Sequence, residues 1–476
     1  MAPPSPEFTK VPRWAHVADS ACILLVVAAA SVAASGGFRL RLGSWRIGVT
    51  SPYPLLAWAA IAGIIRHVAV PHRPIYADFP QRVAAWWRVP TVRAAATVVA
   101  GTRPAILLVG YLAVLTVGFA GGRAPLRYFN NELLNLPVRW DASWYLEIAN
   151  QGYRFVPERP DLQQNIVFLP AYPMLVRTAG RLFGHQMTGF TVAGVCVSVA
   201  AFFGALIYLY ELARQWVDED AALLALWLIA AYPFAVFFGA IYTESLFLLG
   251  TTGAFYHFSK RQFGRAALWG LLVGLTRPNG VLLAVPLAIA AVSARHALAC
   301  VPSADAPVRF PYARALAAAA MPAVGVLLYS AYVWSLTGEP FAWLKGQAAW
   351  GRTYGGFEEL LRHQYEYISN VGLSGYLATP GYEALNAFAA LFALAMVWPV
   401  FRRLGAVYAV FILLNILPPL AAGGLLSAGR LSSVLFPMFI WLASAIPPPH
   451  RAAWIATSAA LQALNAVLFY TWRPLF

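Results

Sequence analysis

The segment 136–153 is more charged and aromatic than a spacer between two apolar stretches requires. It contains Asp141, whose carboxylate could act as a general base that takes a proton from an attacking hydroxyl. If residues 141–150 form a helix, Asp141 occupies its first turn and Gly152 ends it, so a second interpretation of Asp141 is a helix N-cap. Glu147 lies about 240° around that helix from Asp141, which favours a single general base over the carboxylate pair of a hydrolase.

Two further charged residues lie beside apolar stretches. Glu244 begins such a stretch after Tyr242 and Thr243, and Arg277 lies between two others. An unpaired charge at such a place is costly, so it is expected to be paired or functional. For Arg277 the alternative is a long side chain that reaches the membrane interface.

The composition shows which environment must position these residues. The chain has 476 residues, of which 60% are hydrophobic and 11% charged, whereas soluble domains are about 45–50% apolar and about 25% charged. The sequence therefore predicts an all-α polytopic membrane protein. Its 34 Lys and Arg against 19 Asp and Glu give a net charge of +15. These basic residues lie in short runs between apolar stretches, which argues against nucleic-acid binding. The spacing of the three cysteines fits neither a metal site nor a disulfide framework.

Apolar windows of the length that crosses a bilayer predict about 13 transmembrane helices, within a range of 11 to 14. They lie near 17–36, 51–66, 104–121, 188–210, 221–238, 244–258, 266–276, 280–293, 315–336, 384–401, 405–421, 431–446 and 452–470. Several are short, so some of them are expected to be broken or re-entrant helices.

The basic residues between the windows predict the orientation of the chain. Between residues 66 and 103 there is one acid, Asp78, and six arginines: Arg66, Arg73, Arg82, Arg88, Arg93 and Arg103. By the positive-inside rule this segment and the N-terminus are cytoplasmic. Two long loops, 122–187 and 337–383, then face outside, and the first of them is expected to hold short juxtamembrane helices.

This organisation predicts three modules. Residues 1–103 form a membrane hairpin, which carries an outer β-hairpin near 38–49 and a basic amphipathic segment around Trp86 and Trp87. Residues 104–293 form the catalytic membrane module. Residues 294–476 form a C-terminal membrane module.

Several sequence blocks together resemble those of the PIG-V family, the second GPI mannosyltransferase and its bacterial relatives. The blocks follow the family's order and lie at 140–141, 148–153, 168–173, 242–247 and 276–280. Downstream, Gln347, Trp350, Gly351 and Arg352 resemble an element of bacterial members, and 427–437 resembles a block that contains an arginine. The chain departs from the family at Trp144, where a histidine is frequent, and at Leu431, where a tyrosine is usual.

The resemblance implies a GT-C glycosyltransferase fold and an inverting glycosyltransferase that uses a polyprenyl-phosphate-linked sugar donor. Among such enzymes it favours a mannosyltransferase. It maps the catalytic acid onto Asp141. A lipid phosphate as leaving group calls for fixed positive charge, which predicts donor-phosphate binding by Arg277, Arg352 and Arg430. For Glu244 an ion pair with one of these arginines is favoured over direct contact with a sugar hydroxyl. The residues predicted to bind substrate are Arg139, Trp140, Tyr145, Glu244, Asn279, Gln347 and Trp350.

The resemblance also implies the setting of the reaction. The expected partners are the lipid-linked donor, membrane lipids and a glycolipid, glycan or protein acceptor. The expected place is a bacterial cytoplasmic membrane, with the active site facing outside. No metal motif is present, so no cofactor is predicted, although a divalent metal is left open.

Two other functions remain open. One is a transporter or flippase for a lipid-linked saccharide, although the chain shows no convincing internal repeat of the kind that transporters have. The other is a non-catalytic subunit that presents a lipid donor.

Overall fold

The fold is described from a computed structural model, which covers residues 12–35, 38–42, 45–70, 74, 79–122, 124, 126–159, 161–183, 186–299, 310–378 and 381–475. Within these residues the chain is helical apart from one two-stranded hairpin. The chain divides into two compact units, which are described separately. One comprises Met1–Arg93 and Thr178–Phe190, and the other comprises Ala94–Arg177 and Thr191–Phe476.

The N-terminal unit is built on a pair of helices, α1 (Arg13–Ser35) and α2 (Tyr53–Ala69), which pack against each other. The strands β1 (Phe38–Leu42) and β2 (Trp45–Val49) pair antiparallel between them, which confirms the predicted β-hairpin. Its predicted turn, Gly43 and Ser44, lies outside the described residues. The helix α3 (Phe79–Arg88) follows, and it carries Trp86 and Trp87 of the predicted amphipathic segment.

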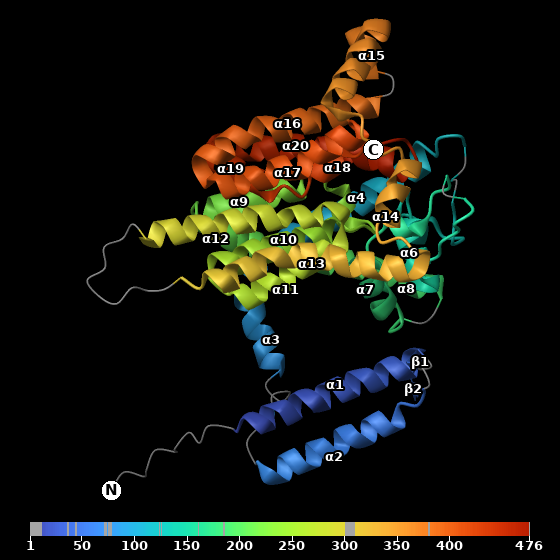
Figure 1. Cartoon of the computed structure of the whole chain (residues 1–476), viewed down its shortest axis with the longest axis vertical. Coiled ribbons are helices and arrows are strands. Elements are labelled where there is room, and N and C mark those ends of the chain that lie inside the picture. Colours follow the sequence, from blue (N-terminus) through green and yellow to red (C-terminus); the bar gives the residue numbers. More distant parts are fainter. Residues whose placement is uncertain are drawn as a thin grey trace. The chain divides into compact units, whose positions relative to one another are not determined.

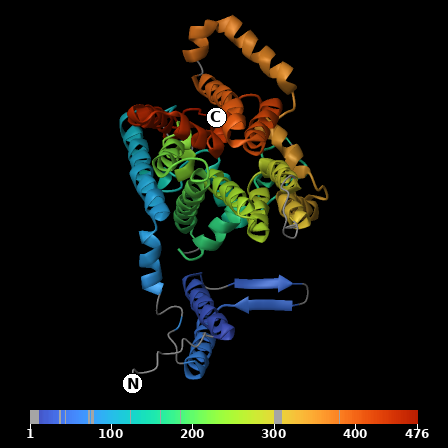
Figure 2. The same cartoon turned by 90° about the vertical axis from the view of Figure 1, so that its left-hand side faces the viewer.

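The larger unit is a bundle of helices, drawn from cyan to red in Figure 1 and seen in Figure 2 after a turn of 90°. Its elements are α4 (Pro90–Thr116), α5 (Glu132–Asn135), α6 (Ala142–Gln151), η2 (Asn165–Val167), α7 (Ala171–Gly180), α8 (Met187–Ala213), α9 (Glu219–Ala230), η3 (Ala235–Gly239), α10 (Glu244–Ser259), α11 (Phe263–Thr276), η4 (Pro278–Leu283), α12 (Ala284–Ala299), α13 (Tyr312–Thr337), α14 (Ala342–Lys345), η5 (Gly346–Trp350), α15 (Gly356–Ala378), α16 (Gly381–Leu404), α17 (Ala406–Gly423), α18 (Ala428–Ser432), α19 (Phe436–Ala445), η6 (Pro448–His450) and α20 (Arg451–Tyr470). The loop 122–187 contains α5, α6 and α7, which confirms the predicted short helices. Figure 1 shows α6 and α14 together at one end of the bundle.

Membrane-spanning helices are confirmed, although they differ in length from the predicted windows. Among the described residues, six helices are long and apolar enough to cross a bilayer, and five apolar helices are shorter. The predicted span 104–121 belongs to a helix that begins at Pro90 and ends at Thr116. The predicted span 221–238 is wrong as one helix, because α9 ends at Ala230 and a 3₁₀ turn follows the helix-breaking Pro233. The window 431–446 is likewise divided between α18 and α19.

Two arginines that the sequence assigned to a basic cytoplasmic segment are buried. Arg103 lies inside α4, and its guanidinium donates hydrogen bonds of 2.6 Å to the carbonyl oxygens of both Ala230 and Ala235. It thereby bonds to the last residue of α9 and to the first residue of η3, on the two sides of the break. Arg66 forms a buried 2.7 Å ion pair with Asp19. These two arginines therefore stabilise the fold. Counting them as loop residues overstated the positive charge that the segment 66–103 exposes.

The helices α11 and α13 are in close contact shortly before α11 ends. A side chain at Gly274 would overlap the carbonyl group of Pro322, so glycine allows the two helices to touch there. The helix α11 ends at Thr276, and Arg277 has extended backbone angles, φ −148° and ψ 151°. This conformation follows from Pro278, because a residue before proline is disfavoured in the helical region. The chain therefore turns at Arg277.

Candidate functional site

Asp141 lies at the start of α6, where the backbone is constrained. The preceding residue, Trp140, has a φ of 56°, which is uncommon for a residue with a side chain and is typical of functional or tightly packed sites. The Trp140 ring packs on Trp472 at a centroid distance of 5.0 Å, and its Nε1 donates to the carbonyl of Phe469. The carboxylate of Asp141 makes no capping hydrogen bond to α6. Asp141 therefore occupies the predicted N-cap position of α6, but its side chain does not act as the cap.

The carboxylate of Asp141 instead contacts Arg430. Its Oδ2 lies 2.8 Å from Nη1 of Arg430, and the two side chains are 18% and 12% exposed, respectively. The remaining exposure leaves Asp141 accessible to a substrate.

Glu244 connects this pair to a second arginine. Its Oε1 lies 3.1 Å from Nε of Arg430 and 3.2 Å from Nη1 of Arg277. Glu244 is fully buried, and it is the first residue of α10, where the helix dipole favours a negative charge. The predicted ion pair of Glu244 with a site arginine is confirmed. Asp141, Arg430, Glu244 and Arg277 form one connected set, which we call the charge network.

Tyr242 contacts both Asp141 and Arg430 of the network. It was not among the predicted site residues. Its hydroxyl accepts a 3.0 Å hydrogen bond from the backbone N–H of Asp141 and donates to the carbonyl of Arg139. Its ring lies under the guanidinium of Arg430, at 5.6 Å from the centroid. The sequence feature that could have identified Tyr242 was its position in the block 242–247, which resembles a PIG-V block. The structure gives Tyr242 the role of holding the backbone of Asp141.

Arg352 lies close enough to the charge network to interact electrostatically with it. Burial and the positive charges of Arg430 and Arg277 lower the pKa of its guanidinium, while the negative charge of Asp141 opposes that shift. The side chain remains charged at neutral pH, because a free arginine has a very high pKa. Among the described residues, no carboxylate lies within ion-pair distance of Arg352. The network and Arg352 together carry three positive and two negative charges.

An aromatic cluster adjoins Arg352 and α6. The Trp350 ring lies 5.2 Å from the rings of both Trp144 and Phe168, and Phe168 stacks on Trp144 at 6.0 Å. The indole Nε1 of Trp350 is buried without a hydrogen-bond partner among the described residues. These rings could pack against a sugar or an isoprenoid chain, which is consistent with the prediction made for Trp350.

Two other predicted substrate-binding residues make internal contacts. Arg139 is fully buried and donates to the carbonyl oxygens of Asn135 and Tyr470, with an ion pair to Glu132 at 3.5 Å. Tyr145 is buried among aromatic rings, and this burial raises the pKa of its hydroxyl. These contacts give both side chains a part in holding the loop 122–187 around Asp141.

Asn279 and Gln347 also bond within the protein. The Asn279 amide donates to Oδ1 of Asn415 at 2.8 Å, and the Gln347 amide donates to the carbonyl of Val167 at 3.5 Å. Neither of these two hydrogen bonds involves a residue of the charge network. In the part of the chain that the structure describes, no three His, Cys, Asp or Glu side chains gather as metal ligands would.

Comparison with solved structures gives a weak likeness. It aligns 79% of the chain with 55% of an Archaeoglobus fulgidus oligosaccharyltransferase, solved tethered to an acceptor peptide, at 13% identity and a TM-score of 0.36. The chain therefore spans about half the length of that protein. A likeness of this size supports no assignment. None of the curated proteins compared with the chain matches it.

Comparison with family models gives a specific match. Residues 125–298 match the family model described as mannosyltransferase (PIG-V). The matched segment includes Asp141, Glu244 and Arg277, whereas Arg352 and Arg430 lie beyond it. Residues 125–298 are thus similar to the PIG-V mannosyltransferase family, which confirms the resemblance carried by the ordered blocks and supports a glycosyltransferase.

Proposed function

We propose that the chain transfers a sugar, mannose above all, from a polyprenyl-phosphate carrier to an acceptor hydroxyl, with Asp141 as the general base. The observation that carries this proposal is the charge network. It places one partly exposed carboxylate beside fixed positive charge in an otherwise apolar bundle. The PIG-V match over residues 125–298 supports the reaction class.

The proposed reaction is a single displacement at the anomeric carbon. The acceptor oxygen attacks that carbon while Asp141 takes the hydroxyl proton, and the bond between the anomeric carbon and the phosphate oxygen breaks. The electron pair of that bond leaves with the lipid phosphate. Attack from the face opposite the leaving group inverts the anomeric configuration.

The arginines match the charge that this reaction develops. The donor phosphate is a diester with one negative charge, and it becomes a monoester with additional charge as the bond breaks. Preorganised positive charge stabilises such a transition state, and arginine can bind phosphate oxygens in pairs. The three arginines exceed the two carboxylates by one charge, and Arg352 supplies that excess. Arg277, Arg352 and Arg430 are thus the proposed phosphate-binding residues.

The proposed setting is a bacterial cytoplasmic membrane, with the site on its outer side. The excess of arginine in the segment 66–103 supports this orientation, although Arg66 and Arg103 serve the fold. A donor carried on a polyprenyl phosphate would reach Asp141 from within the bilayer. No cofactor is included in the proposed reaction.

Replacing Asp141 by Asn tests the proposal. The substitution keeps the side-chain volume and a hydrogen-bond acceptor for Arg430, but it removes the base. We expect the rate of sugar transfer from polyprenyl-phosphate mannose in proteoliposomes to fall by about 10²- to 10⁴-fold. Donor affinity should stay the same or increase, because one negative charge near the phosphate is lost.

The matched control is Asp161→Asn in the same outer loop. Asp161 pairs with Arg159, and both side chains are more than half exposed, so this variant should transfer sugar at the wild-type rate. Transfer by Asp141→Asn at a rate near that of the control would refute Asp141 as the base. A wild-type chain that binds or moves the lipid-linked sugar without transferring it would instead support the flippase or donor-presenting function.

A further inference from the structure

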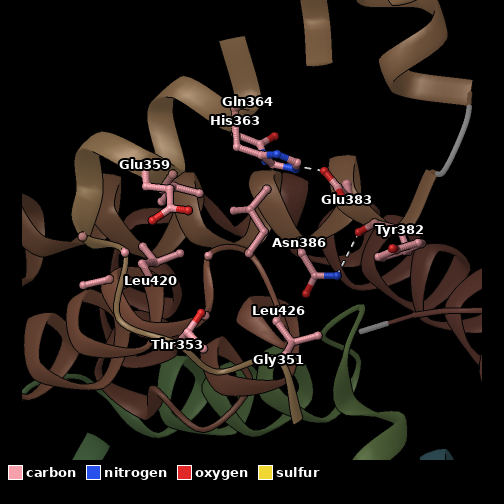
Figure 3. Close-up of a pocket in the computed structure, with 17 residues that line it drawn as sticks. Gly351, Thr353, Glu359, His363, Gln364, Tyr382, Glu383, Asn386, Leu420 and Leu426 are labelled. Atoms are coloured by element: carbon pink, nitrogen blue, oxygen red, sulfur yellow. Dashed lines mark hydrogen bonds between the residues drawn. The ribbon is translucent and has the colours of Figure 1, made fainter. Parts of the chain in front are cut away.

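A cavity of about 300 Å³, lined by both polar and apolar residues, lies between α15, α16 and α17, outside the segment that matches the PIG-V family. Figure 3 shows the polar side chains that line it, from the loop after η5 and from α15 and α16. They are Thr353, Glu359, His363, Gln364, Glu383 and Asn386. Its volume is at the lower end of the range of about 300–1,000 Å³ for small-molecule sites.

Glycines form much of the cavity wall and keep one carboxylate in place. Gly423 and Gly424 line one side, and Gly424 has a φ of 59°, which favours glycine. A side chain at Gly355 would overlap the carboxylate of Glu359, so glycine at this position leaves room for that group. The space therefore depends on residues without side chains.

Two residues that line the cavity, Asn386 and Gly423, lie next to the segments that carry Arg430 and Arg352. Asn386 is buried, and its Oδ1 accepts a 2.8 Å hydrogen bond from the backbone N–H of Gly429, the residue before Arg430. On the other side, a Cβ at Gly423 would lie 3.3 Å from Nη1 of Arg352. The lining residues Asn386 and Gly423 therefore connect the cavity to the backbone beside Arg430 and to the side chain of Arg352.

The cavity is acidic, whereas the network together with Arg352 has one excess positive charge. Glu359 and Glu383 are acidic, and the Gln364 amide lies 3.5 Å from Oε2 of Glu383. Carboxylates accept hydrogen bonds from neutral hydroxyl groups, and amides both accept and donate them, whereas two carboxylates repel a phosphate. The phosphate of a donor is therefore expected at the arginines and not in this cavity.

We propose that this cavity is the acceptor subsite, and that it binds an uncharged, hydroxyl-rich glycan. The inference rests on the proposed function, because it assigns the acceptor side of the same reaction. Glu359 and Glu383 accept hydrogen bonds from the glycan hydroxyls. The attacking hydroxyl extends past Arg352 toward Asp141.

The first test measures binding without a donor. Methyl α-D-mannopyranoside is the probe, and its saturable binding to the full-length chain in nanodiscs is followed by saturation-transfer NMR. We expect Glu359→Gln combined with Glu383→Gln to weaken binding by about tenfold or more, since hydrogen bonds to charged groups are the stronger ones. Glu358→Gln combined with Glu366→Gln is the matched control, because these α15 residues do not line the cavity.

A second pair of variants fills the cavity. Thr353→Trp places a large ring in the cavity and should abolish binding of the probe. Tyr354→Trp changes the next residue, which is 84% exposed and does not line the cavity, and should bind as the wild type does. Absence of saturable binding to the wild-type chain, or equal binding by all four variants, would overturn the inference. Tighter binding of mannose 1-phosphate, lost in Thr353→Trp, would overturn the expected preference for an uncharged ligand.

Failure of the acceptor subsite can be told apart from failure of the proposed function. Asp141→Asn should bind the probe normally while losing transfer. If the cavity variants lose the probe but the wild-type chain transfers no sugar, the subsite stands and the proposed reaction fails. If the chain transfers sugar but the cavity variants keep both probe binding and the acceptor KM, the subsite is wrong and the reaction stands.

Discussion

Replacing Glu244 by Gln would test whether the charge network is held together as the structure indicates. Glu244 is fully buried, with Arg277 at 3.2 Å and Arg430 at 3.1 Å. The substitution leaves Arg277, which is 7% exposed, without a carboxylate in contact, while Arg430 keeps Asp141 at 2.8 Å. Removing one partner of a buried ion pair costs about 3–5 kcal/mol. We expect a loss of that size in the free energy of unfolding.

The double variant Glu244→Gln, Arg277→Met separates loss of the pair from loss of packing. Methionine keeps an apolar chain in the place of Arg277 but removes the unpaired charge. The double variant should therefore be more stable than the sum of the two single variants predicts, with a coupling energy of at least about 1 kcal/mol. The free energy of unfolding would be measured for all four proteins in the same mixed micelles by denaturant titration.

An exposed ion pair provides the control for this cycle. Arg214 and Glu219 lie 3.3 Å apart, and their side chains are 37% and 72% exposed. Glu219→Gln should change stability by no more than about 1 kcal/mol. A Glu244→Gln variant as stable as this control, or a double-mutant cycle with no coupling, would refute the assignment of Glu244 as the residue that holds the two arginines.

Three further substitutions test the site and the packing that positions it. Arg352→Gln should raise the KM for the polyprenyl-phosphate donor by about tenfold or more, because a charge-assisted contact to phosphate is lost; an unchanged donor KM would contradict its phosphate role. Tyr242→Phe removes the hydroxyl that holds the backbone of Asp141, so kcat should fall by about tenfold while the donor KM stays constant. A fall in donor affinity alone would speak against that positioning role. Gly274→Ala should lower the free energy of unfolding by about 1–3 kcal/mol, because the added methyl overlaps Pro322 of α13. Wild-type stability of this variant in a thermal unfolding measurement would show that α11 and α13 do not touch there.

The sequence was sufficient for the features that depend on local composition. A chain with 11% charged residues cannot cover a water-facing surface of its size, so membrane helices were predictable. The β-hairpin at 38–49 was predictable from alternating residues. Asp141, Glu244 and Arg277 stood out because each charge lies beside apolar residues, where it needs a partner or a function.

Helix breaks and buried arginines were harder to predict. The apolar run 221–238 gives no sign by hydropathy that α9 ends at Ala230, and Arg103 has the same sequence context as an arginine at a membrane surface. Its burial depends on carbonyls that lie more than 120 residues further along the chain. A rule based on counting charges in loops cannot separate these two cases.

The pairing within the site was decided only by the tertiary structure. Arg430 was identified as a candidate from the sequence, but its partner Asp141 lies 289 residues away. The support from Tyr242 and the cavity beside Arg352 likewise bring together segments that are distant in the chain. Local periodicity determines which residues share a helix face, whereas the packing of helices determines which faces meet. The sequence by itself therefore determined that the protein is built of membrane helices and that a few charged residues lie beside apolar stretches. The packing of the helices brought those charged residues together into a site.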